Sequence, residues 1–290
     1  MFSVLSLSSC GTVWDWLWSR DHGAIIDTDD MILEEPGENL FEGAVEYTGE
    51  AHSGTGIYYL GKAGNPNAAR IIVIDAGHQQ KGSSDLEPNG PESDVQKAEV
   101  TWGAKGVFTG QSEYALNLNV ALWLRNVLID RGYSVVMIRE TNEVSISNME
   151  RAKIANKYHA DAYIRIHANS WTDETMSGAM TICQSANNPY PTCAAHYLES
   201  KQLSTFILDE FCRRPTGIKK LNVREMDDMT ATNWSQVPTT ILEMGFLSNE
   251  FDDKTMSSSH FAPEAANGIA NGLEAYFAWH ESQIESDTAQ

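Results

Sequence analysis

Basic residues, cysteines and long apolar runs are all scarce in this sequence. Its 290 residues include 20 Lys and Arg against 40 Asp and Glu, which gives a formal net charge of -20 at pH 7. Nucleic acid is therefore not expected as a partner, because neutralising phosphates requires a cationic surface. No stretch beyond the N-terminus is long and apolar enough for a membrane-spanning helix, so no membrane span is expected. The length suffices for one large domain with a full hydrophobic core.

The four cysteines do not indicate a disulfide scaffold, and no pair has the close spacing of metal ligands. Cys183 and Cys193 flank a proline-containing turn and could close a short disulfide loop, which an extracellular protein could keep oxidised. Cys212 lies in a helical stretch and is expected to be a small buried residue.

Residues 1–68 have no sustained hydrophobic period and form an N-terminal extension. The segment LSSC at 7–10 resembles the end of a bacterial lipoprotein signal, although the positive n-region and most of the apolar segment are missing. Cys10 is therefore either a lipid anchor or a plain free cysteine. Residues 27–50 are acidic and poor in apolar repeats, which indicates a tether or a flap that could occlude an active site.

The main domain is expected to begin with a buried strand at residues 71–75, which is rich in β-branched side chains. Ala76 and Gly77 allow a tight turn, so that His78 is presented at the carboxyl tip of the strand. Open α/β sheets keep their chemistry at this edge. A single histidine at a strand tip is weak evidence, so the interpretation depends on what other strands bring to the same edge.

Strands and helices alternate along the rest of the domain, which is expected to run from 69 to 280. The pattern predicts helices at 113–132, 147–158 and 262–280 and strands at 133–138, 162–166 and 239–243. It also predicts a loop without a clear period at 79–110 and a frayed polar tail at 281–290. Such alternation is typical of βαβ units. We therefore expect a single α/β domain with a mostly parallel twisted sheet flanked by helices and a site at the carboxyl ends of the strands.

Four residues that can bind metal or transfer protons are predicted to meet at that edge. His78 and His167 each follow a strand, Glu243 ends a strand, and Glu113 opens a helix that follows a strand. Two imidazoles and one carboxylate match a catalytic zinc site, where three protein ligands leave the fourth position to water. A second carboxylate that does not bind the metal can take a proton from that water and pass it on.

Five segments, in order, resemble the zinc-dependent N-acetylmuramoyl-L-alanine amidases of bacterial cell walls. They are IDAGH at 74–78, EYALNL at 113–118, RAKIAN at 151–156, ADAYIRIHAN at 160–169 and LEMGFLSN at 242–249. The resemblance covers about residues 69–277. It departs at Ala76, where the family commonly has proline, and at Gln79 and Gln80, where the family has further glycine.

The resemblance implies the roles of the four residues and the reaction. His78, Glu113 and His167 would bind one zinc ion, and Glu243 would be the catalytic residue, acting as general base and acid on a zinc-bound water. The substrate would be peptidoglycan, cut at the amide bond between N-acetylmuramic acid and L-alanine by a secreted or cell-wall-associated bacterial enzyme. One alternative is a zinc peptidase acting on the stem peptides. The other is a non-catalytic wall-binding regulator, and the complete set of four residues argues against this second alternative.

Other polar residues allow two interpretations each. Arg139 could meet a substrate carboxylate or carbonyl, or pair with Asp75 or Glu140. Asn169 could bind substrate or cap the following turn. Trp234 could form a wall of the groove or pack in the core or at the rim. The remaining six histidines are expected to be structural or to face solvent: His22, His52, His159, His196, His260 and His280.

Overall fold

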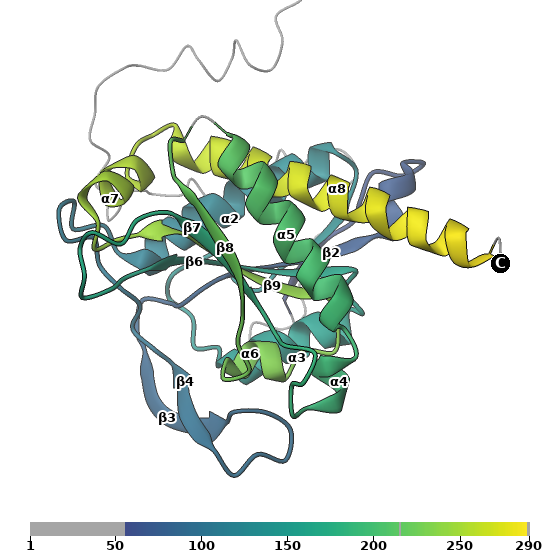
Figure 1. Ribbon diagram of the computed structural model, residues 1–290, viewed down its shortest axis with the longest axis horizontal. Coiled ribbons are helices and arrows are strands. Elements are labelled where there is room, and N and C mark those ends of the chain that lie inside the picture. The colour runs from purple at the N-terminus through teal and green to yellow at the C-terminus, as the bar shows by residue number, and fades with distance from the viewer. Residues whose placement is uncertain (1–55, 215, 289–290) are drawn as a thin grey trace, which may run out of the picture. The chain divides into compact units, whose positions relative to one another are not determined.

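The protein is described by a computed structural model that covers residues 56–214 and 216–288 (Figure 1). The expectations for the N-terminal extension, namely the tether or flap and the lipid anchor at Cys10, lie outside the described residues. His22 and His52 lie outside them as well. Along the described part of the chain, none of the helices combines the length and apolarity that crossing a membrane requires.

The centre of the structure is a mostly parallel sheet of seven strands. Their spatial order is β1 (Ile57–Tyr59), β5 (Ser134–Met137), β2 (Ile71–Ala76), β6 (Ala162–Asn169), β9 (Thr239–Phe246), β7 (Ala179–Cys183) and β8 (Lys220–Glu225). The four strands β5, β2, β6 and β9 run parallel to one another. β1 is antiparallel to β5, and β7 is antiparallel to β9 but parallel to β8. This confirms the α/β fold predicted from the sequence.

Helices cover both faces of the sheet (Figure 1). One face packs against α2 (Glu113–Asp130), α5 (Tyr197–Arg213) and α8 (Phe261–Thr288), and the other packs against α3 (Asn148–Lys157) and α6 (Thr230–Asn233). The remaining helical segments are η1 (Pro66–Ala69), α4 (Pro191–Ala194) and α7 (Glu250–Met256).

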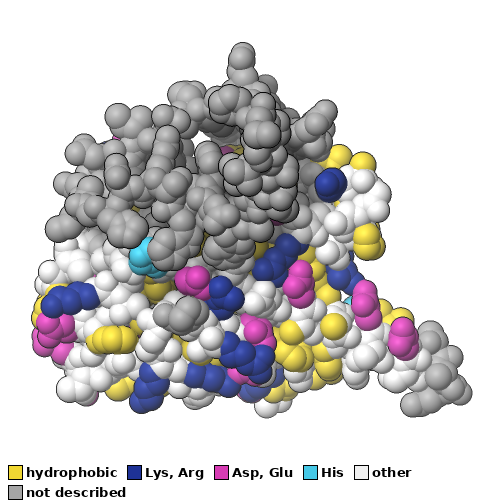
Figure 2. All heavy atoms as spheres, turned by 90° about the horizontal axis from the view of Figure 1, so that it is seen from above, with side chains coloured by type: hydrophobic (Ala, Val, Ile, Leu, Met, Phe, Trp, Pro, Cys, Tyr) yellow, Lys and Arg dark blue, Asp and Glu magenta, His cyan; other side chains and the backbone are white. Residues whose placement is uncertain are grey.

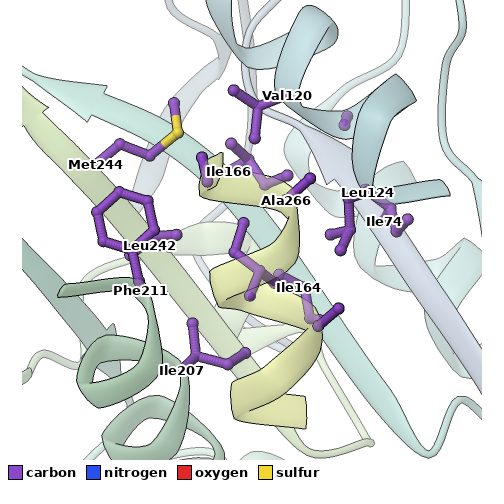
Figure 3. Packing of buried hydrophobic residues seen from close by; sticks show 14 of the residues in the cluster. Ile74, Val120, Leu124, Ile164, Ile166, Ile207, Phe211, Leu242, Met244 and Ala266 are labelled. Atoms are coloured by element: carbon purple, nitrogen blue, oxygen red, sulfur yellow. The ribbon is translucent and has the colours of Figure 1, made fainter. Parts of the chain in front are cut away.

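The apolar run of β2 is buried on both faces, as expected for a central parallel strand. Ile72 and Ile74 belong to the core cluster on the side of α2 and α8, and Val73 belongs to the cluster on the side of α3. Figure 3 shows the larger cluster, in which Ile164 and Leu242 from neighbouring strands lie close to α8. The two glycines of α8 allow close packing on α5, because a Cβ at Gly272 would lie 2.5 Å from the Cα of Ile207.

The order of the strands places the carboxyl end of β2 at a switch point. From β2 the chain passes through α2 to β5 on one side, and then through α3 on the opposite face to β6 on the other side. Open α/β sheets form their crevice where successive connections lie on opposite faces in this way. His78 follows β2 at this point, and His167 lies near the end of the adjacent β6.

Residues 79–110 differ from the predicted loop, because they contain a two-stranded antiparallel hairpin. Its strands are β3 (Ser83–Pro88) and β4 (Gln96–Val100), and Figure 1 shows it extending from the sheet beside α6. The sequence did not reveal it because most side chains of both strands are polar and at least partly exposed, so no apolar alternation marks them.

The hairpin is anchored to helices on the α3 and α6 face of the sheet. The buried Glu87 accepts hydrogen bonds from the backbone N–H of Met149 at the start of α3 (3.0 and 3.1 Å). Trp234 Nε1 donates to the carbonyl of Pro88 (2.8 Å), and Asn233 Nδ2 donates to the carbonyl of Asn89 (2.9 Å). Trp234 is partly buried against the smaller core cluster, in agreement with the packing interpretation.

The structure decides between the two alternatives for Cys183 and Cys193, and it differs from the expected C-terminal tail. Cys183 and Cys193 are both buried free cysteines, and Cys193 donates a hydrogen bond to the carbonyl of Thr232 (Sγ to O, 3.1 Å). Residues 281–288 are not frayed, because α8 continues to Thr288. The sheet also includes β1, which precedes the first strand that the sequence pattern predicted.

The outer surface of the helical layer carries mixed charge. Seen from the side of α5 and α8, basic and acidic side chains are interspersed over the described surface (Figure 2). Some of them form ion pairs, such as Arg131 with Glu274 (3.0 Å) and Arg214 with Glu264 (2.5 Å). Pairs of this exposure contribute little to stability.

Candidate metal centre

His78, Glu113 and His167 come together at the carboxyl edge of the sheet. Each offers one ligand atom, and these atoms all lie within 4.8 Å of one another. Glu113 Oε1 lies 3.1 Å from His78 Nε2 and 3.2 Å from His167 Nδ1, and the two imidazole rings are nearly perpendicular. The structure therefore brings together the three residues that the sequence selected as metal ligands.

The backbone at Gly77 and His78 has a conformation that few residues can adopt. His78 has a φ of 60°, a left-handed conformation that a residue with a side chain adopts only when its surroundings impose it. The preceding Gly77 lies against the ring of His167, where a Cβ would be 2.2 Å from the imidazole Nε2. Glycine at 77 is therefore required for the close approach of His167, in addition to the turn expected from the sequence.

The imidazole of His78 is oriented by Thr101, which the sequence analysis missed. His78 Nδ1 lies 3.0 Å from the carbonyl oxygen of Thr101 and 3.3 Å from its hydroxyl. A hydrogen bond from Nδ1 to the carbonyl fixes the tautomer and leaves Nε2 with a lone pair for a metal. Thr101 follows the hairpin, and no pattern in the sequence distinguishes it.

Glu113 is held in place at the start of α2. Its Oε2 accepts a hydrogen bond from the N–H of Ala104 (2.7 Å), and its Oε1 accepts one from the N–H of Ala168 (3.2 Å). Burial alone would raise the pKa of this carboxyl group, but the hydrogen bonds and charges of His167 and His78 outweigh burial and keep the pKa well below its usual range. The position at a helix N-terminus also favours a carboxylate.

His167 and Glu243 lie side by side on adjacent strands. Residues 167 and 243 are paired in the register of β6 and β9. Burial, the largest cause, lowers the pKa of His167 to about 4, so that its imidazole is neutral and can bind a metal. Burial and the charge of Glu113 raise the pKa of Glu243 to about 8, and a bound cation would act in the opposite direction.

Two buried polar atoms at the centre have no partner among the described residues. They are His167 Nε2 and Glu243 Oε2. Buried polar atoms are normally satisfied, and an exception calls for an explanation such as a bound ion or water. Two imidazoles and one carboxylate are the donor set that zinc takes when it keeps one position for water or substrate, so the residues present fit a zinc ion.

The turn that carries His78 rests on a buried ionic network. Asp75, at the end of β2, is fully buried and accepts hydrogen bonds from Arg151 Nη1 (2.5 Å) and Arg165 Nε (2.8 Å). Burial raises the pKa of Asp75, but the charges of Arg151 and Arg165 more than offset it and hold the pKa far below its usual range. Arg151 also donates to the carbonyls of Ala76 (3.0 Å) and His78 (3.1 Å), so one guanidinium joins the strand to the metal-site turn.

Arg139 is a structural residue here. It is buried, and its guanidinium donates to the carbonyls of Ala76 (2.8 Å), Gly77 (3.2 Å) and Tyr114 (2.7 Å). It therefore has no exposed edge for a substrate. Among the described residues Arg139 forms no ion pair with Asp75 or Glu140, because Arg151 and Arg165 bind Asp75 and Arg125 binds Glu140.

Asn169 lies at the end of β6 and lines a cavity beside the metal centre. Its Oδ1 accepts a hydrogen bond from the N–H of the adjacent Ser170 (2.8 Å). The side chain is only partly buried. A role for Asn169 in binding substrate stays a prediction.

Two cavities meet at the metal centre. One has a volume of about 430 Å³ and the other about 340 Å³, and they share His78, Thr101, His167 and Glu243 in their walls. The first extends under the hairpin, between β4 and α6, and the second extends toward Trp102 and Asn169. The candidate metal ligands and Glu243 therefore lie in the middle of a groove that continues on both sides.

The fold and the site together define an α/β protein with a candidate metal centre at the carboxyl edge of its sheet. A family model described as N-acetylmuramoyl-L-alanine amidase matches residues 72–275, and the chain belongs to this family. The sequence is 23% identical over 256 residues to the N-acetylmuramoyl-L-alanine amidase AmiA of Salmonella typhimurium, which covers 77% of this chain and 81% of that protein.

Solved structures of amidases share the fold. The N-acetylmuramyl-L-alanine amidase Ami1 of Mycobacterium smegmatis superposes with a TM-score of 0.63 at 22% identity, covering 72% of this chain and 97% of that chain. The catalytic domain of the amidase CwlV of Bacillus (Paenibacillus) polymyxa gives a TM-score of 0.57 at 25% identity, covering 72% of this chain and 98% of that chain. Residues 1–71 and 276–290 lie outside the stretch that the family model matches.

Replacing Gly77 by alanine is expected to weaken metal binding without unfolding the protein. The added Cβ would overlap the His167 ring and displace a ligand. We expect zinc affinity to fall by about 10- to 100-fold, the usual effect of disturbing the residues that orient ligands. Titration calorimetry measures this. Gly64→Ala is the control, because Gly64 also has a positive φ but no atom lies within 4 Å of its added Cβ. Equal affinities in both variants would contradict the prediction.

Replacing Arg151 by methionine is expected to destabilise the fold strongly. The change leaves Asp75 buried with one guanidinium instead of two and removes donors from the carbonyls of Ala76 and His78. Breaking a buried ion pair from one side typically costs about 3 to 5 kcal/mol. Urea unfolding measures the loss. Lys201→Met is the control, because its pair with Glu225 is partly exposed and should contribute less than about 1 kcal/mol. Similar losses would refute the special role of Arg151.

Proposed function

We propose that this protein hydrolyses the amide bond between N-acetylmuramic acid and L-alanine in bacterial peptidoglycan, with one zinc ion held by His78, Glu113 and His167. The observation that carries the proposal is the convergence of these three side chains within 4.8 Å, with Glu243 on the adjacent strand. Membership of the amidase family supports the choice of substrate. A cell-wall substrate implies action outside the cytoplasm, at the cell wall.

A zinc ion bound there would act as a Lewis acid toward the amide carbonyl and would acidify water. The protein's own residues provide the remaining chemistry. Thr101 orients the His78 ring, and Ala104 and Ala168 orient the Glu113 carboxylate through their N–H groups. These contacts place the ligands before metal binds, so little reorganisation is needed during the reaction.

Glu243 has the position and the free atom needed to move a proton. It lines both cavities, and its Oε2 has no hydrogen-bond partner in the described structure. An amide nitrogen is a very poor leaving group unless it is protonated as the bond breaks. Glu243 would therefore take a proton from the attacking water and deliver it to the nitrogen of L-alanine.

Digestion of purified peptidoglycan tests the proposed reaction. We expect the protein to release intact stem peptides with L-alanine at the amino terminus, and a chelator to abolish the release until zinc is restored. Mass spectrometry of the products distinguishes the amidase from a peptidase, which would cut within the stem and leave L-alanine attached to the sugar. Unaltered peptidoglycan in the presence of zinc would contradict both and favour a wall-binding protein.

Replacing Glu243 by glutamine is expected to separate metal binding from turnover. The amide keeps the shape of the side chain but cannot accept the proton, so turnover should fall by about 10²- to 10⁴-fold. Elemental analysis should still find one zinc per chain. Glu250→Gln is the control, because Glu250 is exposed and its described ion pair is with Lys254, four residues away. Loss of zinc together with activity would mean that Glu243 is a ligand, and our assignment would be wrong.

A further inference from the structure

The two cavities beside the metal centre differ in character. We call the larger one the hairpin cavity; it lies between β4 and α6 and includes Lys97, Met229 and Ala231 in its walls. We call the other the tryptophan cavity; it includes Trp102, Asn169 and Ser170. Because the metal centre lies where they meet, a substrate cleaved there must place its two parts in different cavities.

Lys97 brings a weakly held positive charge into the hairpin cavity. Its side chain is 37% exposed, and its Nζ donates to the backbone carbonyl of Asp228. The carboxylate of Asp228 is 3.7 Å away, beyond hydrogen-bond distance, and is itself 63% exposed. An ammonium group has three donors, so Lys97 retains capacity for a further acceptor.

The other cation of this cavity is already committed. Arg165 is 4% exposed and binds Asp75 through Nε and the side-chain oxygen of Asn148 through Nη2 (2.9 Å). The acidic groups in the wall are Asp228 and Glu243. Lys97 is therefore the basic side chain of this wall that can exchange its present contact for a carboxylate of a bound ligand.

Trp102 gives the tryptophan cavity a flat apolar surface. Its side chain lies against Gly82, where a Cβ would be 2.9 Å from the indole Cγ, and the residue is nevertheless 64% exposed. Glycine at 82 thus allows the indole to lie on the backbone with much of its surface open. A large exposed aromatic side chain next to polar groups is typical of a binding surface.

We propose that the stem peptide occupies the hairpin cavity with one of its carboxylates on Lys97, and that the glycan strand occupies the tryptophan cavity against Trp102. This orientation rests on the proposed amidase function. Stem peptides carry free carboxylates that Lys97 can pair with, whereas the glycan is uncharged and offers the C–H faces of its sugar rings to an indole. Lys97 is then a specificity residue for acidic rather than amidated stem peptides.

The test compares two glycan-chain substrates that differ only in whether the stem carboxylates are free or converted to carboxamides. We expect the zinc-loaded wild-type protein to have a KM about tenfold lower for the acidic form, which corresponds to about 1.4 kcal/mol. Lys97→Met should remove this preference by raising the KM for the acidic form alone, with kcat little changed. Lys97→Arg should keep the preference, because the positive charge remains.

Lys81→Met is the matched control, because Lys81 is an exposed lysine at the base of the hairpin and lines neither cavity. It should behave as wild type. Thermal unfolding of each variant shows whether the hairpin has been disturbed. A loss of activity that is equal for both substrates in Lys97→Met would make Lys97 merely structural and overturn the proposal. If wild type cleaves neither substrate, the proposed amidase function fails instead.

Trp102→Ala tests the other half of the orientation. It should raise the KM for glycan chains by about threefold, the order expected for one aromatic contact, with less effect on a single muramoyl peptide. The preference for acidic stem peptides should stay as in wild type. Trp171→Ala is the control, because Trp171 is similarly exposed but lines neither cavity. If Trp102→Ala instead removed the preference for acidic stems, the substrate would lie the other way round and the proposal would be wrong.

Discussion

The site depends on one buried ionic network around Asp75. A carboxylate with no exposure at the end of β2 is held by Arg151 and Arg165, and Arg151 continues to the carbonyls of the next turn. Burying charged groups costs free energy, and a buried ion pair often contributes less to the stability of the fold than apolar packing would. Here the network also fixes the geometry of the turn that carries His78. Its presence is best explained by that geometric role.

Backbone strain and buried polar atoms without hydrogen-bond partners are found at the residues next to this network. His78 adopts a left-handed φ, Gly77 leaves room for an imidazole, and His167 and Glu243 each keep a buried atom without a partner. The strained φ and the two unsatisfied atoms cost free energy in the unbound protein. A bound cation would offset part of that cost, because it favours the ionised carboxylates. Metal binding and folding stability should therefore be coupled in this chain.

The sequence revealed the features that depend on apolar patterns and on residue type at strand ends. The buried run before His78 and the alternation of strands and helices predicted the parallel sheet, and the sheet then required His78, Glu113, His167 and Glu243 to converge. The β3 and β4 hairpin was missed because its exposed polar strands have no period to detect. Thr101 was missed because it acts through a carbonyl oxygen that every residue has. Arg139 was misjudged, because the tertiary carbonyls that it binds leave no local signal.

The β3 and β4 hairpin turns the candidate metal centre into a groove with two distinct sides. Without β4, Lys97 would not lie beside His78, and the candidate metal ligands would lie on an open sheet edge. The hairpin can form one wall of the groove because it is held in place. Hydrogen bonds of Glu87, Trp234 and Asn233 connect the hairpin to α3 and α6. The ligands at the strand ends are suited to hydrolysis of an amide. The charged and aromatic side chains on and after the hairpin are the ones to which we assign the orientation of the substrate.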